Sequence, residues 1–374
     1  MSFKNRLIFL NKFQKVGIFV ILPFFLSCIQ LSVYANSENV PKALKLTCEY
    51  QHNPLLVPTN TPIFGWQLQS DQKNIRQSAY AMEVYSLNNG KKIKIWDSGK
   101  VQSSQNQHVK YNGKEILEPE KEYLWRVKVW DSNNTPSKWS EMNTFRRAPS
   151  ETELKGEWIG AIDKKDANIP EGRKYHGLSL SSEAGKKWNA TDPLSRRSIY
   201  LRKDFSVKKK IANAIIYISG LGHYELTLNG KKLGDSQFDP MWSDYDKTIY
   251  YNAYDITDAL QQKNAIGVLL GNGFFNEQGG RYAKMQVSFG PPTLFFKMTA
   301  TYTDGTRQDI VSDGSWKYSL SPLVFNDMYG GEDYDARLEQ EGWDTYGFNE
   351  SEWLPVVVQS APKGKLTPGT FFST

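Results

Sequence analysis

Two clusters of acidic residues lie in the second half of this 374-residue chain, and paired carboxylates are the residues that general acid and base chemistry requires. They are Asp244 with Asp246, and Glu332, Asp333 with Asp335. Residues at i and i+2 of a strand share a face, but nothing in the pattern places a substrate between them. Asp335 and Arg337 have the same spacing, which favours an ion pair that fixes a loop. We therefore interpret both clusters as structural and predict no catalytic residue.

A second group of residues combines aromatic and amide side chains at predicted loop positions. Aromatic faces stack on the apolar face of a pyranose, while amides and carboxylates bind hydroxyls. The candidate sugar-binding residues are Asn229, Asp239, Trp242, Asn272, Asn276 and Tyr282. Alternatives stay open for three of them: Asn229 and Asn272 also fit turns beside glycine, and Trp242 also fits a cover for a sheet edge.

The cysteines and histidines indicate neither a disulfide framework nor a zinc site. The only cysteines are Cys28 and Cys48, and no histidine has a second histidine at i+3 or i+4. The residues alone therefore do not show whether the protein binds a metal ion. We interpret Cys48 as a small buried apolar residue.

The first 35 residues have the order of a secretory signal. A basic region ends at Lys15, an uncharged apolar run follows, and Val33-Tyr34-Ala35 offers a small-residue cleavage site. We predict cleavage after Ala35 and a secreted or periplasmic protein. Leu26-Ser27-Cys28 also resembles a lipoprotein processing site, so the alternative is an outer-membrane lipoprotein attached to the membrane through lipid on Cys28.

The net charge gives little support to nucleic-acid binding. The formal charge is +6, and four of the positive residues precede Ala35, so +2 remains after cleavage. No block of Lys and Arg is left that could follow a phosphate backbone, and we predict no nucleic-acid partner.

The elements that must position the candidate residues are almost all strands. Residues 43–148 contain period-two runs such as 79–85 and 123–130, separated by turn sequences, which predict a fibronectin-III-like β-sandwich. Residues 149–198 are polar and rich in Lys, Gly and Ser, which predicts a connector. Antiparallel strand patterns with the hairpin turn Asn229-Gly230 then predict a jelly-roll β-sandwich over 199–360, and 361–374 form a short tail. Only 255–260 has the pattern of a short helix.

The order of several short motifs resembles the N-terminal half of bacterial α-L-rhamnosidases, a family of inverting glycoside hydrolases. The first unit carries Pro62-Ile63-Phe64-Gly65-Trp66, Trp96-Asp97-Ser98-Gly99 and Trp125-Arg126-Val127-Lys128-Val129-Trp130. The second carries Gly222-His223-Tyr224-Glu225-Leu226, Trp242-Ser243-Asp244-Tyr245, Leu270-Gly271-Asn272-Gly273-Phe274 and Tyr334-Asp335-Ala336-Arg337. Each motif is weak alone, and the series in order is strong.

The resemblance implies both a function and a limit. Members of this family continue past the segment that resembles Pro362-Lys363-Gly364-Lys365-Leu366 into an (α/α)₆ barrel with the catalytic carboxylates, whereas this sequence shows no run of helical period. The expectation is a non-catalytic N-terminal portion that binds rhamnose-containing glycans and requires no cofactor, with calcium as an optional bridging ion because some members bind L-rhamnose through it. The alternative is a stand-alone carbohydrate-binding protein or a structural spacer.

Overall fold

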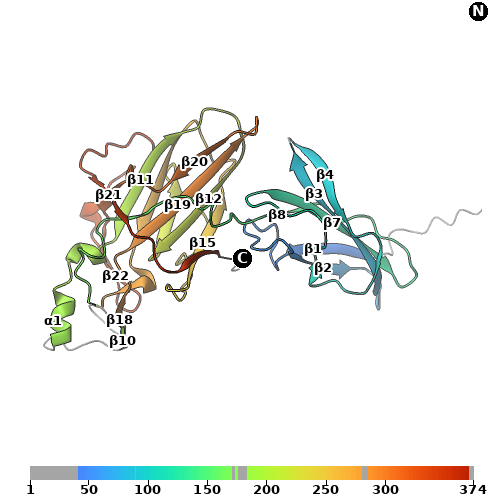
Figure 1. Cartoon of the computed structure of the whole chain (residues 1–374), viewed down its shortest axis with the longest axis horizontal. Coiled ribbons are helices and arrows are strands. Elements are labelled where there is room, and N and C mark those ends of the chain that lie inside the picture. The colour runs from blue at the N-terminus through green and yellow to red at the C-terminus, as the bar shows by residue number, and fades with distance from the viewer. Residues whose placement is uncertain (1–40, 89, 171–172, 176–182, 280–284, 370–374) are drawn as a thin grey trace, which may run out of the picture. The chain divides into compact units, whose positions relative to one another are not determined.

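The computed structural model describes residues 41–88, 90–170, 173–175, 183–279 and 285–369 (Figure 1). In this part of the chain nearly every regular element is a strand, as the sequence predicts. The described residues include no helix with the length and apolar character needed to cross a membrane. The predicted signal at 1–35 lies outside the described residues.

The first β-sandwich is built from two antiparallel sheets, in the orders β1-β2-β6 and β4-β3-β7-β8, with β5 paired to β3. Its strands are β1 (Lys42–Cys48), β2 (Ile63–Gln69), β3 (Gln77–Asn88), β4 (Lys91–Asp97), β5 (Val101–Gln102), β6 (Val109–Lys110), β7 (Glu122–Asp131) and β8 (Asn143–Arg146). Side chains alternate along β7, so Trp125, Val127 and Val129 enter the core, where they meet Phe64 and Trp66 of β2. This alternation is the period-two pattern that predicts the sandwich. Cys48 is buried and free, in agreement with its interpretation as an apolar residue.

The second β-sandwich has larger sheets, in the orders β14-β13-β16-β11-β21-β24 and β25-β9-β19-β12-β15-β26, with β20 paired to β19. The first of these sheets contains β11 (Ile199–Ser206), β13 (Tyr224–Leu228), β14 (Lys231–Lys232), β16 (Lys263–Leu270), β21 (Lys317–Leu320) and β24 (Leu354–Pro355). The second contains β9 (Trp158–Gly160), β12 (Ile211–Leu221), β15 (Thr248–Asp255), β19 (Thr293–Tyr302), β20 (Arg307–Val311), β25 (Val357–Gln359) and β26 (Lys365–Pro368). Leu201 and Val268 of one sheet pack with Ile216 and Phe296 of the other in a single apolar core. The two-sheet architecture agrees with the predicted jelly roll.

Several short elements lie outside the main sheets. A three-stranded sheet joins β10 (Arg173–Tyr175), β17 (Asn276–Glu277) and β18 (Met285–Ser288), and a hairpin joins β22 (Leu323–Asp327) to β23 (Gly331–Tyr334). The helical elements are α1 (Glu183–Asn189), η2 (Pro193–Arg196), η3 (Gly273–Phe275) and η4 (Ala336–Leu338).

The interval predicted as a connector, 149–198, contributes to the second sandwich. Strand β9 pairs with both β19 and β25, because Trp158 and Ile159 are buried and their backbone groups need partners inside the sheet. It also contains α1, the α-helix of the described residues. The tail predicted at 361–374 contributes β26, which pairs in parallel with β15.

The helix predicted over 255–260 is wrong. Asp255 ends β15, and its carboxylate accepts hydrogen bonds from the backbone N–H and the hydroxyl of Thr257 at 2.9 and 2.6 Å. A short polar side chain that bonds two residues ahead stabilises a turn instead of a helix.

Candidate functional site

The predicted sugar-binding residues divide into exposed and buried groups in the structure. Trp242 is 59% exposed, whereas Asn272 and Asn276 are 3% and 1% exposed. Tyr282 lies outside the described residues. For all six, a role in sugar binding stays a prediction, and the surroundings of the five described residues differ sharply.

Asn229 sits in the turn between β13 and β14 with a φ of 53°, in the left-handed region that Asn tolerates. Its side chain donates to Asn264 at 3.0 Å and accepts from the backbone N–H of Ala265 at 2.9 Å. Both hydrogen-bonding ends of the amide are thus used to close the turn against β16.

Asp239 holds the loop that carries Trp242. Its carboxylate accepts hydrogen bonds from Tyr254 at 3.0 Å and Ser236 at 2.9 Å, and its carbonyl accepts from the backbone N–H of Tyr224 at 2.8 Å. These bonds tie the start of the loop to β13 and β15. The peptide bond between Asp239 and Pro240 is cis.

Asn272 and Asn276 belong to a buried amide network under the loops. Asn276 donates to the carbonyl of Ser195 at 2.7 Å and to the Asn272 side chain at 2.8 Å, and it accepts from Gln278 and Ser288. Asn272 in turn bonds the backbone of Arg196 and both the backbone and the side chain of Asn326. The network joins η2, η3, β17 and β22, so its amides are engaged within the protein.

Trp242 is part of a group of rings that we call the aromatic surface: Phe238, Trp242 and Tyr329, which are exposed, and Phe274, which is half-buried. The rings of Trp242 and Phe274 stack with centroids 5.1 Å apart and planes 24° apart, and Phe274 meets Tyr329 edge-on at 6.4 Å. Phe238 and Tyr329 are 67% and 36% exposed. Exposed apolar groups of this size mark interaction sites more often than isolated exposed residues do.

His223 lies behind the aromatic surface and links its two sides. Its ring is 5.6 Å from that of Phe238 and 6.3 Å from that of Phe274. Burial lowers the pKa of His223, which favours the neutral imidazole. Two glycines allow the close approach: a Cβ on Gly273 would lie 2.4 Å from the His223 ring, and one on Gly222 would lie 2.1 Å from the carbonyl oxygen of Gly271.

The loop after Pro240 presents Trp242 outward because its next aromatic residue points inward. Tyr245 is 8% exposed and packs edge-on against Phe275 at 5.1 Å and Phe289 at 5.2 Å. The buried tyrosine anchors the loop while the indole three residues earlier stays in solvent.

Tyr329 is positioned by a buried carboxyl group. Glu277 is 1% exposed and accepts a hydrogen bond from the backbone N–H of Met328 at 2.9 Å, while Asp327 accepts from the backbone N–H groups of Tyr329 and Gly330. Burial, together with a hydrogen bond to Asp327, raises the pKa of Glu277 to about 8.

The acidic clusters have structural partners. Asp335 accepts from the backbone N–H of Arg337 and forms an ion pair with its guanidinium at 2.6 Å, and Arg337 holds the pKa of Asp335 at about 2. Asp244 pairs with Lys247 at 3.0 Å. The ion pair expected from the spacing of Asp335 and Arg337 is therefore present.

No metal centre can be built from the described side chains alone, since they contain no group of three or more His, Cys, Asp or Glu that could hold an ion. Calcium prefers six to eight oxygen ligands. Because backbone carbonyl and amide oxygens also serve as calcium ligands, the optional calcium ion stays a prediction.

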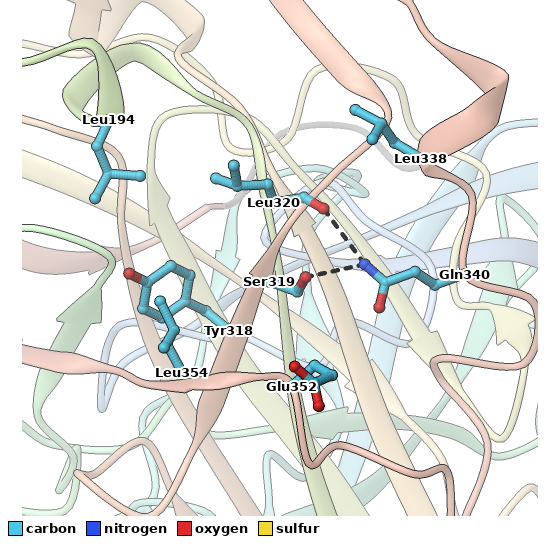
Figure 2. Close-up of a pocket in the computed structure, with 8 residues that line it drawn as sticks. All are labelled: Leu194, Tyr318, Ser319, Leu320, Leu338, Gln340, Glu352 and Leu354. Atoms are coloured by element: carbon cyan, nitrogen blue, oxygen red, sulfur yellow. Dashed lines mark hydrogen bonds between the residues drawn. The ribbon is translucent and has the colours of Figure 1, made fainter.

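A cavity of about 370 Å³ lies elsewhere on the second sandwich, beside β21 and β24 (Figure 2). Four leucines and four polar or aromatic residues line it. Neither these leucines nor Phe238, Phe274 and Tyr329 were predicted as site residues. The aromatic residues adjoin predicted turns, which is the one signal that could have indicated them, whereas the cavity residues come from separate segments that share no motif.

The comparisons with known proteins agree with both sandwiches. Residues 43–150 match the family model "Rha78A-like, N-terminal immunoglobulin domain", and residues 209–370 match "Alpha-L-rhamnosidase N-terminal domain". Two curated relatives named alpha-L-rhamnosidase, from Formosa agariphila and Alteromonas sp. (strain LOR), are each 33% identical to the chain. The alignments cover 96% and 92% of this chain but 37% and 35% of the relatives.

A solved structure gives the same result. The alpha-L-rhamnosidase from Dictyoglumus thermophilum is 35% identical, with a TM-score of 0.72 over 89% of this chain and 36% of that one. The chain thus spans about a third of the length of the relatives that it matches. Because two family models match in order and the relatives match across nearly the whole chain, this chain belongs to the α-L-rhamnosidase family and carries its N-terminal β-domains.

Proposed function

We propose that the chain is a non-catalytic, glycan-binding portion of an exported α-L-rhamnosidase-like protein, and that the aromatic surface binds rhamnose-containing glycans. Relatives named alpha-L-rhamnosidase support the substrate class, and the exposed rings support the place of binding. The proposal includes no nucleic-acid partner. It includes membrane association only if Cys28 carries a lipid.

The stacked pair of Trp242 and Phe274 is the observation that carries this proposal. An indole left 59% exposed keeps a large apolar area in water, which costs roughly 25 cal/mol per Å² until a ligand covers it. The C–H groups on one face of a pyranose match such a flat ring.

Catalysis is assigned to none of the described residues. Inverting hydrolysis needs one carboxylic acid and one carboxylate about 6.5–9.5 Å apart across an accessible sugar. Asp244 is ion-paired with Lys247, and Asp335 is ion-paired with Arg337. Glu277 has a raised pKa that would suit a general acid, but it is 1% exposed and therefore out of reach of a glycoside. We expect no release of nitrophenol from an aryl α-L-rhamnoside, and turnover that disappears in Asp244→Asn or Asp335→Asn would contradict this assignment.

The binding experiment is isothermal titration of the chain with L-rhamnose and a rhamnose-capped oligosaccharide, with calcium and with a chelator. We expect a Kd on the order of millimolar, about −4 kcal/mol, and a roughly tenfold loss in Trp242→Ala. Heat that requires calcium would make the ion part of the bound complex; equal heat with the chelator would mean that no cofactor is required.

The matched control is Tyr50→Ala, which removes an aromatic ring of similar exposure (57%) from the first sandwich. It should bind like the unmodified chain. Absence of heat with every sugar would favour the spacer function over glycan binding.

Export is tested separately by intact-mass measurement of the mature protein. Cleavage after Ala35 gives a chain that starts at Asn36. A lipid-modified Cys28 at the N-terminus would instead establish an outer-membrane lipoprotein.

A further inference from the structure

The cavity beside β21 and β24 has an apolar wall that is unusual for this protein. Leu194 of η2, Leu320 of β21, Leu338 of η4 and Leu354 of β24 line it. In the part of the chain that the structure describes, four leucines are classed as exposed, and three of them, at 38%, 39% and 55%, are in this cavity. Such a concentration of exposed leucines at one hollow indicates a ligand that covers them.

The remaining lining residues give the cavity a polar side. In Figure 2 the Ser319, Gln340 and Glu352 side chains lie together, away from Leu194, Tyr318 and Leu354. The Gln340 amide is fixed, because it donates to Ser319 at 2.9 Å and accepts from the Trp353 indole at 2.8 Å. The Gln340 amide is therefore engaged within the protein, and other groups must form the hydrogen bonds to a ligand.

Three groups remain for a ligand. The Ser319 hydroxyl accepts from Gln340 and still has its own proton to donate. No described residue forms a hydrogen bond with the Tyr318 hydroxyl, or a hydrogen bond or ion pair with the exposed Glu352 carboxylate. A carboxylate can accept from two neighbouring hydroxyls of a sugar at once, and its charge disfavours anionic ligands.

We propose that this cavity is a second sugar subsite that binds a terminal 6-deoxyhexose such as L-rhamnose. Its methyl group lies against the leucines, and its vicinal hydroxyls face Glu352 and Ser319. The volume of about 370 Å³ is within the range of small-molecule pockets and accommodates one pyranose ring. The inference rests on the proposed function for its substrate class, and it concerns a site separate from the aromatic surface.

The leucine wall also determines which sugar the cavity rejects. L-Mannose has the configuration of L-rhamnose but carries a hydroxyl on carbon 6. That hydroxyl would lie among leucine side chains with the Tyr318 hydroxyl as its one polar neighbour in the lining, which disfavours binding relative to a methyl group. The cavity therefore prefers the deoxy sugar by about tenfold or more.

The test uses the full chain in a Trp242→Ala background, so that the aromatic surface does not contribute. L-Rhamnose and L-mannose are titrated while the leucine methyl signals are followed by NMR. We expect L-rhamnose to shift the methyl signals of Leu338 and Leu354 and L-mannose to do so at least tenfold more weakly. Leu338→Asn and Glu352→Gln should each weaken L-rhamnose binding about tenfold.

Leu44→Asn is the control, since Leu44 is an equally exposed leucine (41%) in the first sandwich. Circular dichroism checks that each variant is folded. Equal responses to the two sugars, or L-rhamnose binding unchanged in both cavity variants, would overturn the subsite. If Trp242→Ala alone abolishes binding, the proposed function stands and this inference fails; if the unmodified chain binds no rhamnose, both fail.

Discussion

The amide network and the aromatic surface lie close along the chain but use their side chains in opposite ways. Asn272 and Asn276 have their hydrogen-bonding groups engaged within the protein, whereas Trp242 and Phe274 present stacked rings at the surface. The two regions adjoin at η3, where Phe274 lies between the asparagines. Residue types that suit sugar recognition also suit the construction of a loop, and burial decides which role is available.

The largest loss of stability expected from a substitution at a single pH is that of Asn276→Ala. The substitution removes four hydrogen bonds in a buried setting: the two that Asn276 donates to the Ser195 carbonyl and the Asn272 side chain, and the two that it accepts from Gln278 and Ser288. We expect the free energy of unfolding to fall by about 3 kcal/mol in urea titrations. A stable variant that fails to bind rhamnose would contradict the structural role of Asn276 and indicate that its side chain contacts the ligand.

The next effect is a pH dependence centred on Glu277. Its pKa is about 8 in the folded chain against an ordinary value of 4.5, so the folded state holds a proton that the unfolded state releases. The stabilisation is complete below pH 4.5 and is lost as pH rises toward 8, by at most about 1.4 kcal/mol per pH unit.

Glu277→Gln should remove this slope, because a neutral amide resembles the protonated carboxyl. Unfolding by urea at pH 5, 6, 7 and 8 measures it. A variant with the same slope as the unmodified chain would show that another group titrates.

Trp242→Ala should change the free energy of unfolding by less than about 1 kcal/mol, since the indole is mostly in solvent and its loop is anchored by Tyr245. This sharpens the comparison with Asn276→Ala, measured in the same titration. An unfolded Trp242→Ala chain would show that the indole is part of the core packing and not of a binding surface.

The smallest effect is expected from Asp335→Asn. An amide oxygen can still accept from the backbone N–H of Arg337, and the lost ion pair is exposed, with 88% of the Arg337 side chain in solvent. The melting temperature and rhamnose binding should be unchanged within error. A large loss of binding would give this acidic cluster a role that its contacts do not show.

The sequence predicts the architecture well because burial alternates along the strands. The run that contains Trp125 shows this period directly, whereas Ile199 to Arg202 of β11 are all buried, because Trp343 stacks on Tyr200 and covers the outer face of this strand. The site is less predictable. Asn272 and Asn276 read as loop residues because the β22–β23 hairpin that covers them comes about 50 residues later.

Other parts of the site leave no local signal at all. The cavity leucines come from 194, 320, 338 and 354, and only the folded sheet brings them together. Strand β9 could not be predicted for the same reason. Its three residues lie inside a polar interval and form a strand because β19 and β25 pair with them on both sides.

Strand β26 has a consequence for the solubility of the protein. It pairs in parallel with Thr248–Tyr251 of β15, whose other edge pairs with β12. Without Lys365–Pro368, the backbone groups of β15 beside the buried Ile249 and Tyr251 would form an open sheet edge, which promotes aggregation between chains. Pro368 is the last residue of β26, and because a proline has no N–H to donate, it disfavours the pairing of a further strand with β26 at this position. A shortened version of the second sandwich should therefore retain Lys365–Pro368 so that this edge of β15 stays paired.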